Sequence, residues 1–381
     1  MARAPQNRQT ENARFFDYSL LFILIFLLGF GLVMLYSVSS YEAVSSGLAP
    51  TYYLRKQFIA IIIGLIVMFI VAMIPYDVWK AFSLPAYVLA IILCVAVLVM
   101  GTDANGSTRW LTIGGISVQP SELAKVAIII FLAAILSRIP REIASGYTVI
   151  KIVIFLLPVL AMVAYSNLST AIIIAGIAII MMFVVSPKYS HFIALIGVGI
   201  LGAIIMTLAM SYRSARIKAW IHPERYPDDA YQTLQGLYAI GSGGLFGKGL
   251  GGSIQKLDYV PEAQNDFIFS IIVEELGIFG AVCVIVLFAL LIWRFMVIAN
   301  NAKDLFGSLI VVGVMAHISL QVILNIAVVT NTIPNTGITL PFISYGGTSV
   351  VVLLAEMGLV LAVSRSIPLK MDSLGTLRMV E

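Results

Sequence analysis

Long apolar runs are the feature that most constrains this sequence. A membrane-spanning helix needs about 20 predominantly apolar residues. We find ten such runs, at residues 17–38, 57–75, 81–101, 121–138, 150–165, 169–186, 190–211, 265–299, 306–329 and 342–364. We therefore expect an all-α polytopic membrane protein with about ten transmembrane helices.

The composition supports a single membrane domain. The chain is 60% hydrophobic and only 11% charged, and its mean hydropathy is +1.02. A soluble domain carries about 25% charged residues. We expect a cytoplasmic tail at 1–16, a transmembrane domain at 17–365 with a long extracytoplasmic loop at 212–264, and a second cytoplasmic tail at 366–381. The net charge of +4 is too small to favour a nucleic-acid partner.

Basic residues set the expected orientation, because cytoplasmic loops collect Lys and Arg. With both termini in the cytoplasm, the inner segments hold Arg3, Arg8, Arg14, Lys80, Arg138, Arg141, Lys151, Lys188, Arg294, Lys303, Arg365, Lys370 and Arg378. The short outer loops hold only Arg55, Lys56, Arg109 and Lys125.

The long outer loop is itself basic. It carries Arg213, Arg216, Lys218, Arg225, Lys248 and Lys256. One interpretation is a solvated loop near anionic lipid headgroups, and the other is a site for an anionic substrate such as a phosphate.

A glycine-rich stretch runs from Gly241 to Ser253 within this loop. Its spacing fits neither a dinucleotide fingerprint in a βαβ unit nor a phosphate-binding P-loop. It is either a flexible loop or a segment whose backbone N–H groups approach a pyrophosphate, with Lys248 adding a positive charge.

Asp266 follows Pro261, which cannot lie inside a helix. We therefore expect Asp266 in the first turn of the eighth span. One interpretation is a helix-capping aspartate that compensates the dipole. The other is a general base at the membrane surface.

The segment from Arg109 to Lys125 is a second polar candidate. Pro120 and Ser121 are expected to open the fourth span, with Gln119 before them and Glu122 paired with Lys125 at i, i+3. The pair either closes helix packing or forms a polar wall of a substrate cavity, where Arg109 and Trp110 would hold a phosphate at the interface. We also expect Arg55 to contact substrate.

Several polar residues lie within the predicted spans. Glu274, Glu275 and Glu356 are intramembrane carboxylates, which are functional candidates unless they pair with buried partners. The segment 339–348 contains Pro341 and paired glycines, and it predicts a broken entry to the tenth span that lines a cavity, with Ser344 as a substrate contact. The three histidines show no ligand spacing.

These motifs together resemble the SEDS family of bacterial cell-envelope proteins, which includes FtsW, RodA and SpoVE. The resemblance covers about residues 18–365. It is carried by Gln119-Pro-Ser-Glu122 with Lys125, by 242–251, by Pro261-Glu262 with Asp266-Phe-Ile-Phe269, and by 337–347. The run Leu32-Val-Met-Leu-Tyr-Ser37 and the tail Val363-Ser-Arg365 look more like FtsW and SpoVE than RodA.

The resemblance implies a peptidoglycan glycosyltransferase that polymerises lipid II at the outer face of the bacterial cytoplasmic membrane during cell division. It places an essential aspartate at Asp266 and implies as partners a class B penicillin-binding protein and other division proteins. A divalent cation, Mg²⁺ or Mn²⁺, at the pyrophosphate is one candidate cofactor. The alternatives are a lipid II flippase and a non-catalytic division scaffold.

The sequence departs from the family pattern at two positions. Asn167 stands where members often carry Asp, so any carboxylate role there is lost. Asn265 replaces a more usual threonine before Asp266, where it could still cap the helix.

Overall fold

The computed structural model describes residues 15–104, 107–113, 116–186, 188–208, 211–371 and 377–379. Within these ranges nine helices are long and apolar enough to cross a membrane. A tenth, α4, is apolar but has 17 residues. The ten helices are α1 (Tyr18–Ser45), α2 (Tyr52–Met73), α3 (Asp77–Met100), α4 (Pro120–Leu136), α5 (Gly146–Ser166), α6 (Leu168–Val185), α7 (Ser190–Leu208), α10 (Ile268–Asn300), α11 (Leu305–Val329) and α12 (Gly347–Ser364).

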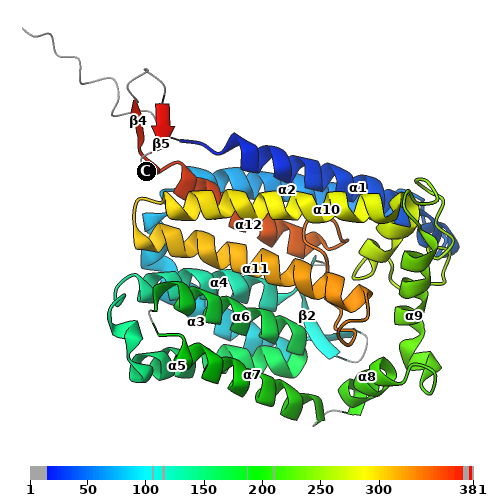
Figure 1. Ribbon diagram of the computed structural model, residues 1–381, viewed down its shortest axis with the longest axis horizontal. Coiled ribbons are helices and arrows are strands. Elements are labelled where there is room, and N and C mark those ends of the chain that lie inside the picture. The colour runs from blue at the N-terminus through cyan, green and yellow to red at the C-terminus, as the bar shows by residue number, and fades with distance from the viewer. Residues whose placement is uncertain are drawn as a thin grey trace, which may run out of the picture.

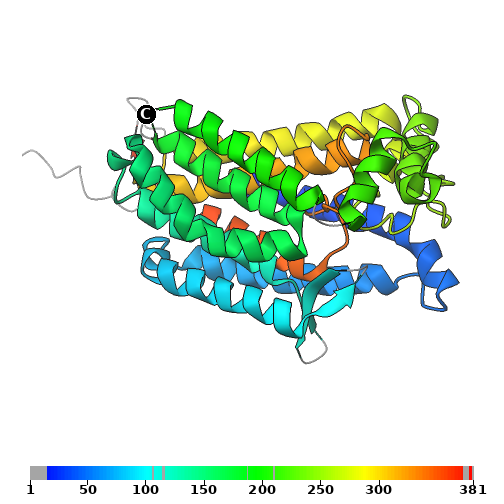
Figure 2. The same cartoon turned by 90° about the horizontal axis from the view of Figure 1, so that it is seen from below.

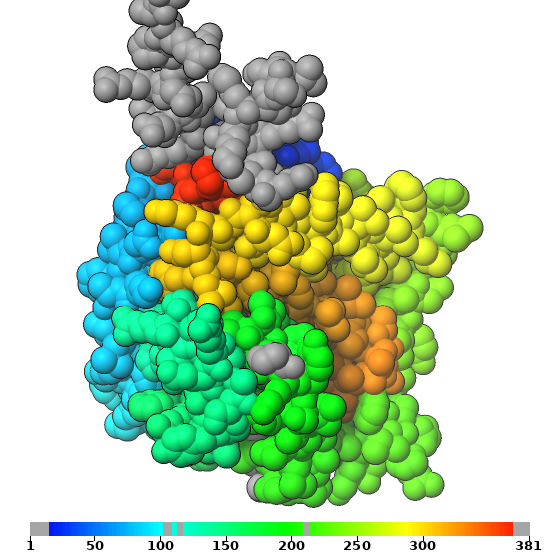
Figure 3. All heavy atoms as spheres, turned by 60° about the vertical axis from the view of Figure 1, so that its left-hand side comes forward, coloured from blue at the N-terminus to red at the C-terminus, as the bar shows by residue number. Residues whose placement is uncertain are grey.

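The helices form one bundle in which they run side by side (Figures 1 and 2). Helices α4, α11 and α12 are the most buried spans, and α11 and α12 lie against α2, α4, α6 and α10. Helix α7 contacts α5, α6 and α8 and is the most exposed span. When the left-hand side of Figure 1 is turned forward, α10 (yellow) and the segments around α7 (green) form much of the visible surface (Figure 3).

The start of α1 and the end of α12 lie at the same end of the bundle (Figure 1). Asp17 caps α1 by accepting a hydrogen bond from Leu20 N, and its carboxylate accepts another from Arg294 at 2.6 Å. This ion pair fixes the start of α1 against α10. Two short strands, β4 (Leu369–Met371) and β5 (Leu377–Met379), follow α12.

The opposite end carries a small sheet and two short helices (Figure 1). Strands β1 (Thr102–Ala104), β2 (Ser107–Ile113) and β3 (Ile116–Val118) pair antiparallel in that order. The expected long loop contains two helices, α8 (Ser211–Ile221) and α9 (Pro227–Ser242). A single 3₁₀ turn, η1 (Glu142–Ala144), precedes α5.

Helix α10 is broken at Gly277, whose φ of 69° and ψ of −170° are not helical. The glycine-rich loop after α9 fills the break. The backbone N–H groups of Lys248 and Gly249 donate to the carbonyls of Glu274 and Glu275, both at 2.9 Å. These carbonyls precede the break and would otherwise lack partners in an apolar environment.

The second half of α10 is joined to the same loop. Ile278 N and Phe279 N donate to the carbonyls of Gly244 and Leu245 at 3.0 and 3.1 Å. A Cβ at Gly247 would lie 2.1 Å from the Glu275 carbonyl oxygen, so only glycine fits this approach. Within the glycine-rich stretch, the backbone N–H groups of Lys248 and Gly249 are therefore used inside the protein, so these two do not face a pyrophosphate.

The segment between α11 and α12 is non-helical, as predicted for a broken entry to the last span. Its turn is fixed from two sides. The Ser344 hydroxyl accepts a hydrogen bond from Leu340 N at 2.8 Å, and the Ser344 carbonyl accepts one from Gln57 at 3.3 Å. The buried Ser344 side chain is thus used within the turn, which removes it as an obvious substrate contact.

Candidate active site

Asp266 lies two residues before α10, not in its first turn as the sequence suggested. The helix begins at Ile268, and its N-cap is Phe267, which makes no side-chain cap bond. Asn265 does not cap the helix either, because it lies two residues before the N-cap; its amide instead donates to Glu262 at 3.0 Å. The prediction that Asp266 caps the helix is therefore wrong.

The Asp266 side chain is buried, with 8% of the residue exposed. Its Oδ1 has no hydrogen-bond partner among the described residues. A buried polar atom of this kind is rare in folded proteins, and it is concentrated at functional sites and hydrated cavities. Oδ1 of the carboxylate is therefore buried but makes no structural hydrogen bond with the described residues.

Backbone contacts hold Asp266 between α11 and the segment before α12. Asn325 donates one amide hydrogen to the Asp266 carbonyl at 2.8 Å and another to the Ile338 carbonyl at 2.7 Å. Gly337 stands beside the carboxylate, and a Cβ there would lie 3.7 Å from Asp266 Oδ2. The Asp266 carboxylate therefore lies beside a glycine, which has no side chain to cover it.

Burial raises the pKa of Asp266 from 3.8 to about 7. The neighbouring carboxylate of Glu262 also raises the pKa, while a backbone hydrogen bond and the charges of Arg216 and Arg109 lower it. A carboxylate with a pKa near 7 is a much stronger base than an exposed one and is still substantially ionised at neutral pH.

Arg109 and Arg216 reach Asp266 from different elements. Arg109 is on β2, half-buried, and its Nε donates to the Ser166 carbonyl at 3.2 Å. Trp110 follows it on β2 and is also half-buried. Arg216 is on α8, exposed, and its guanidinium donates to the Asn335 carbonyl at 3.4 Å. The side chain of Arg213 lies outside the described residues.

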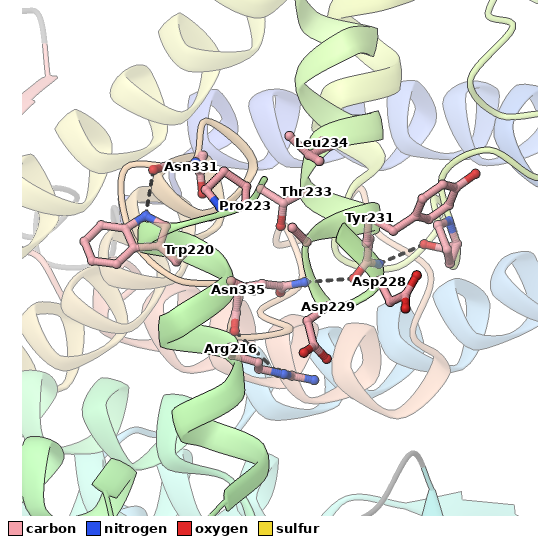
Figure 4. Close-up of a pocket in the computed structure, with 14 residues that line it drawn as sticks. Arg216, Trp220, Pro223, Asp228, Asp229, Tyr231, Thr233, Leu234, Asn331 and Asn335 are labelled. Carbon is pink, nitrogen blue, oxygen red and sulfur yellow. Dashed lines mark hydrogen bonds between the residues drawn. The ribbon is translucent and has the colours of Figure 1, made fainter. Parts of the chain in front are cut away.

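A pocket of about 280 Å³ lies between α8, α9 and the segment 331–335 (Figure 4). Trp220 Nε1 donates to the Asn331 carbonyl at 2.9 Å, which joins α8 to that segment. Gln232 on α9 accepts from Asn335 at 2.8 Å and donates to the Pro261 carbonyl at 2.8 Å. The pocket wall is therefore connected to the short segment that ends at Asp266.

Glu122 and Lys125 form the predicted ion pair on α4, with 2.8 Å between Nζ and Oε1. The pair is almost fully buried, and Glu122 also accepts a hydrogen bond from Ser349 on α12 at 3.0 Å. Gln119 donates to Ser121 at 3.1 Å at the start of the same helix. These contacts join α4 to α12, so the pair contributes to helix packing.

Lys248 and Lys256 pair with the intramembrane carboxylates instead of facing an open site. Lys248 Nζ lies 2.6 Å from Glu274 Oε1, and Lys256 Nζ lies 2.7 Å from Glu275 Oε1. Ser37 on α1 donates to Glu275 at 2.8 Å. Of the two interpretations of Glu275, the structure shows the paired one, with a lysine and a hydroxyl as partners. The two lysines are therefore not free cations for a substrate.

Two other predicted positions have different surroundings. Arg55 is exposed near the start of α2. Asn167 caps α6 by accepting from Thr170 N at 3.2 Å, which explains how it replaces an aspartate locally. No group of three or more His, Cys, Asp or Glu in the described part of the chain is arranged to hold a metal ion.

The sequence interpretation missed His317, Gln321 and Asn325. All three are buried on α11, and Asn325 binds the Asp266 backbone directly. Their spacing of four residues places them on one helix face. This periodicity is visible in the sequence, but each residue alone gave no functional signal.

Comparison with known proteins decides the family. Residues 18–368 match the family model described as cell cycle protein, for FtsW, RodA and SpoVE. The chain belongs to the SEDS family. It is 40% identical to stage V sporulation protein E of Bacillus subtilis strain 168, over 92% of this chain and 97% of that protein. It is 34% identical to a probable peptidoglycan glycosyltransferase FtsW of Trichlorobacter lovleyi, over 93% of this chain and 94% of that protein.

Solved SEDS structures share the fold. A chain of a peptidoglycan synthase complex, described as coordinating polymerization and crosslinking, aligns with a TM-score of 0.77 and 27% identity over 92% of this chain and 98% of that chain. RodA of Thermus thermophilus aligns with a TM-score of 0.69 and 27% identity over 92% of this chain and 97% of that chain. The chain is therefore a multi-pass membrane protein with a RodA-like fold.

Proposed function

We propose that this protein is a peptidoglycan glycosyltransferase that polymerises lipid II at the outer face of the cytoplasmic membrane during cell division. The observation that carries the proposal is Asp266, a buried carboxylate with an unpartnered oxygen and a pKa near 7. The names of relatives such as the FtsW of Trichlorobacter lovleyi support the same reaction.

In the proposed reaction, the acceptor sugar's 4-hydroxyl attacks the anomeric carbon of the donor. Asp266 removes the hydroxyl proton as the new glycosidic bond forms. The bond from the anomeric carbon to the polyprenyl pyrophosphate breaks with its electron pair on the leaving oxygen. The proposed site has one base and no separate nucleophile, so a single displacement with inversion is expected.

Arg109 and Arg216 are the cations that we assign to the pyrophosphate. Both lie close enough to Asp266 to lower the pKa of its carboxyl group. Positive charge near a leaving pyrophosphate stabilises the charge that develops on it. The described residues do not build a metal site of their own, so we derive no step through a divalent cation.

We further propose that the partner is a class B penicillin-binding protein that crosslinks the glycan strand. The support is the structural similarity to a chain of a synthase complex that performs polymerization and crosslinking. The long loop and strand β2 would then lie on the outer side of the membrane, with both termini in the cytoplasm.

The deciding experiment uses the purified protein with its class B partner and labelled lipid II. Wild type is expected to form glycan polymer, and Asp266→Asn, which keeps the shape but not the charge, is expected to form none. Ile323→Ala, on the exposed face of α11, is the control and should polymerise normally.

Two other functions predict different results. Transbilayer movement of lipid II without polymer would favour a flippase. Normal division in cells that carry a folded Asp266→Asn protein would favour a scaffold. Polymerisation by Asp266→Asn at the wild-type rate would show that Asp266 is not the base.

A further inference from the structure

Three polar residues follow one face of α11 toward Asp266. His317, Gln321 and Asn325 are spaced by four residues and are 0%, 3% and 0% exposed. Each step of four residues rises about 6 Å along a helix. The face therefore extends about 12 Å inward from Asn325, the residue that binds the Asp266 backbone.

Each of these residues uses one polar atom in a protein contact and has another without a partner. Asn325 Nδ2 binds two carbonyls, and Gln321 Nε2 donates to the Thr339 carbonyl at 3.1 Å. His317 Nδ1 lies 2.8 Å from Glu356 on α12. Asn325 Oδ1, Gln321 Oε1 and His317 Nε2 have no hydrogen-bond partner among the described residues.

Unpartnered buried atoms are concentrated around this face. The described chain has eleven buried side-chain nitrogen or oxygen atoms without a partner. Four of them belong to Asp266, His317, Gln321 and Asn325. Buried polar groups without protein partners are generally satisfied by internal water molecules.

We propose that water molecules bound along this face of α11 form a proton path from Asp266 to the His317–Glu356 pair. The inference rests on the proposed role of Asp266 as the base. Asp266 must lose the proton it has taken before it can act again, and its Oδ1 is shielded from bulk solvent. The path gives that proton a place to go while substrate or product still covers the site.

The His317–Glu356 pair has the chemistry of a proton acceptor. A carboxylate that accepts Nδ1–H fixes the imidazole tautomer, leaves the lone pair on Nε2 and stabilises the imidazolium once it forms. Nε2 is the ring nitrogen that has no protein partner. Two other charged groups near His317 are on α4. Glu122 interacts electrostatically with this histidine, and Lys125 is the ion-pair partner of Glu122.

The transfer is balanced at each step. The O–H bond of protonated Asp266 breaks and leaves the carboxylate. Each bridging water gains one proton and passes on another, and an N–H bond forms at His317 Nε2. When the glycan product has moved away, the proton returns along the same path and leaves through Asp266 to solvent.

His317→Asn is the first test variant, measured with labelled lipid II and the class B partner. The asparagine amide can still donate to Glu356, but it cannot accept a proton. We expect kcat to fall roughly tenfold or more with KM unchanged, because general acid–base steps contribute factors of this order or larger. The solvent deuterium isotope effect on kcat should increase, because proton release becomes rate-limiting.

Gln321→Leu is the second variant, since it interrupts the middle of the path without touching the ion pairs. It should show the same fall in kcat and the same increase in isotope effect. Ile323→Ala, which faces away from the path with 62% exposure, should resemble wild type in both measurements. If His317→Asn does not fold, Gln321→Leu decides alone.

The proposal is overturned if both variants keep the wild-type kcat and isotope effect while Asp266→Asn is inactive. In that case the base is correct and only the path is wrong. If Asp266→Asn polymerises normally, the proposed function itself fails. A loss of kcat without a change in isotope effect would also overturn the path, because a structural defect alone would account for it.

Discussion

Asp266 combines two properties that a solvent-exposed aspartate does not have. Burial disfavours its charged form, and no described side chain takes up its Oδ1. The result is a strong base at neutral pH whose position is set through its backbone by Asn325. The unfavourable free energy of burying the ionised carboxylate affects both activity and stability.

Activity should depend on pH through Asp266. Only the ionised carboxylate can accept the hydroxyl proton, and its pKa is raised to about 7. We expect kcat/KM for polymerisation to fall about tenfold per pH unit below pH 7 and to level off above it. The measurement is the polymerisation rate between pH 5 and 9. A flat profile from pH 5 to 7 would contradict this assignment.

Asp266→Asn should abolish activity but increase the stability of the folded protein at neutral and higher pH. The pKa rises from 3.8 in the unfolded chain to about 7 in the fold, so the folded state binds the proton more tightly. The folded state is then favoured below pH 3.8, and this stability is lost as pH rises through about 7. A shift of this size corresponds to at most about 4 kcal/mol.

Asp266→Asn should therefore raise the melting temperature at pH 8 and change it little at pH 4. Thermal unfolding in detergent at the two pH values measures the difference. Equal effects at both pH values would show that the ionised carboxylate is not destabilising.

Lys256 and Glu275 illustrate the cost of a buried charge. Both side chains are buried, at 8% and 0% exposure. Lys256→Met leaves Glu275 without its cation and should destabilise the protein by roughly 3–5 kcal/mol. The double variant Lys256→Met with Glu275→Gln should recover most of that loss, as measured by melting temperature. No recovery in the double variant would indicate that Lys256 acts through other contacts.

The break in α10 shows how one element depends on another distant in sequence. Gly277 interrupts the helix, and the loop after α9 supplies the missing hydrogen bonds on both sides of the interruption. The paired glutamates just before the break then bind the two lysines of the same loop. A loop that would be flexible alone becomes part of the packed bundle.

Gly247→Ala should detach this loop. The glycine has φ +78°, and a Cβ would lie 2.1 Å from the Glu275 carbonyl oxygen, so the loop must move away from α10. We expect a lower melting temperature and faster proteolysis within 243–256. Gly241→Ala is the matched control because nothing lies within 4 Å of its Cβ position in α9, and it should be neutral or slightly stabilising.

The bundle as a whole has distinct ends. The start of α1 and the end of α12 are at one end, and α8, α9 and the three-stranded sheet are at the other (Figure 1). The distribution of Lys and Arg predicts that the end with the termini is cytoplasmic. The proposed site would then open to the outside of the membrane.

Labelling with a membrane-impermeant maleimide tests this orientation. In a protein whose two native cysteines, Cys94 and Cys283, are replaced by serine, we expect the Asp228→Cys variant to be labelled in intact cells. The Lys303→Cys variant, in the exposed turn between α10 and α11, should be labelled only after the cells are opened. The reverse pattern would contradict the predicted orientation.

Sequence patterns predicted the elements well where one physical rule dominates. Apolar runs of about 20 residues located the spans, because the bilayer requires that length. The i, i+3 spacing predicted the Glu122–Lys125 pair, and Pro120 marked the start of α4. The start of α10 was predicted less well. The residues between Pro261 and Ile268 form a non-helical turn, but their sequence would also suit the first turn of a helix.

The sequence by itself therefore determined the class of fold, the spans and the segment that carries Asp266. Only the tertiary structure decided which charges remain free. Lys248 and Lys256 looked like substrate cations, yet the break at Gly277 brings Glu274 and Glu275 against them. A helix cap was one of the two interpretations of Asp266, yet the residue lies outside the helix with an unpartnered oxygen. The physical reason is that a partner distant in sequence sets both the burial and the charge of a side chain, and no local pattern contains that information.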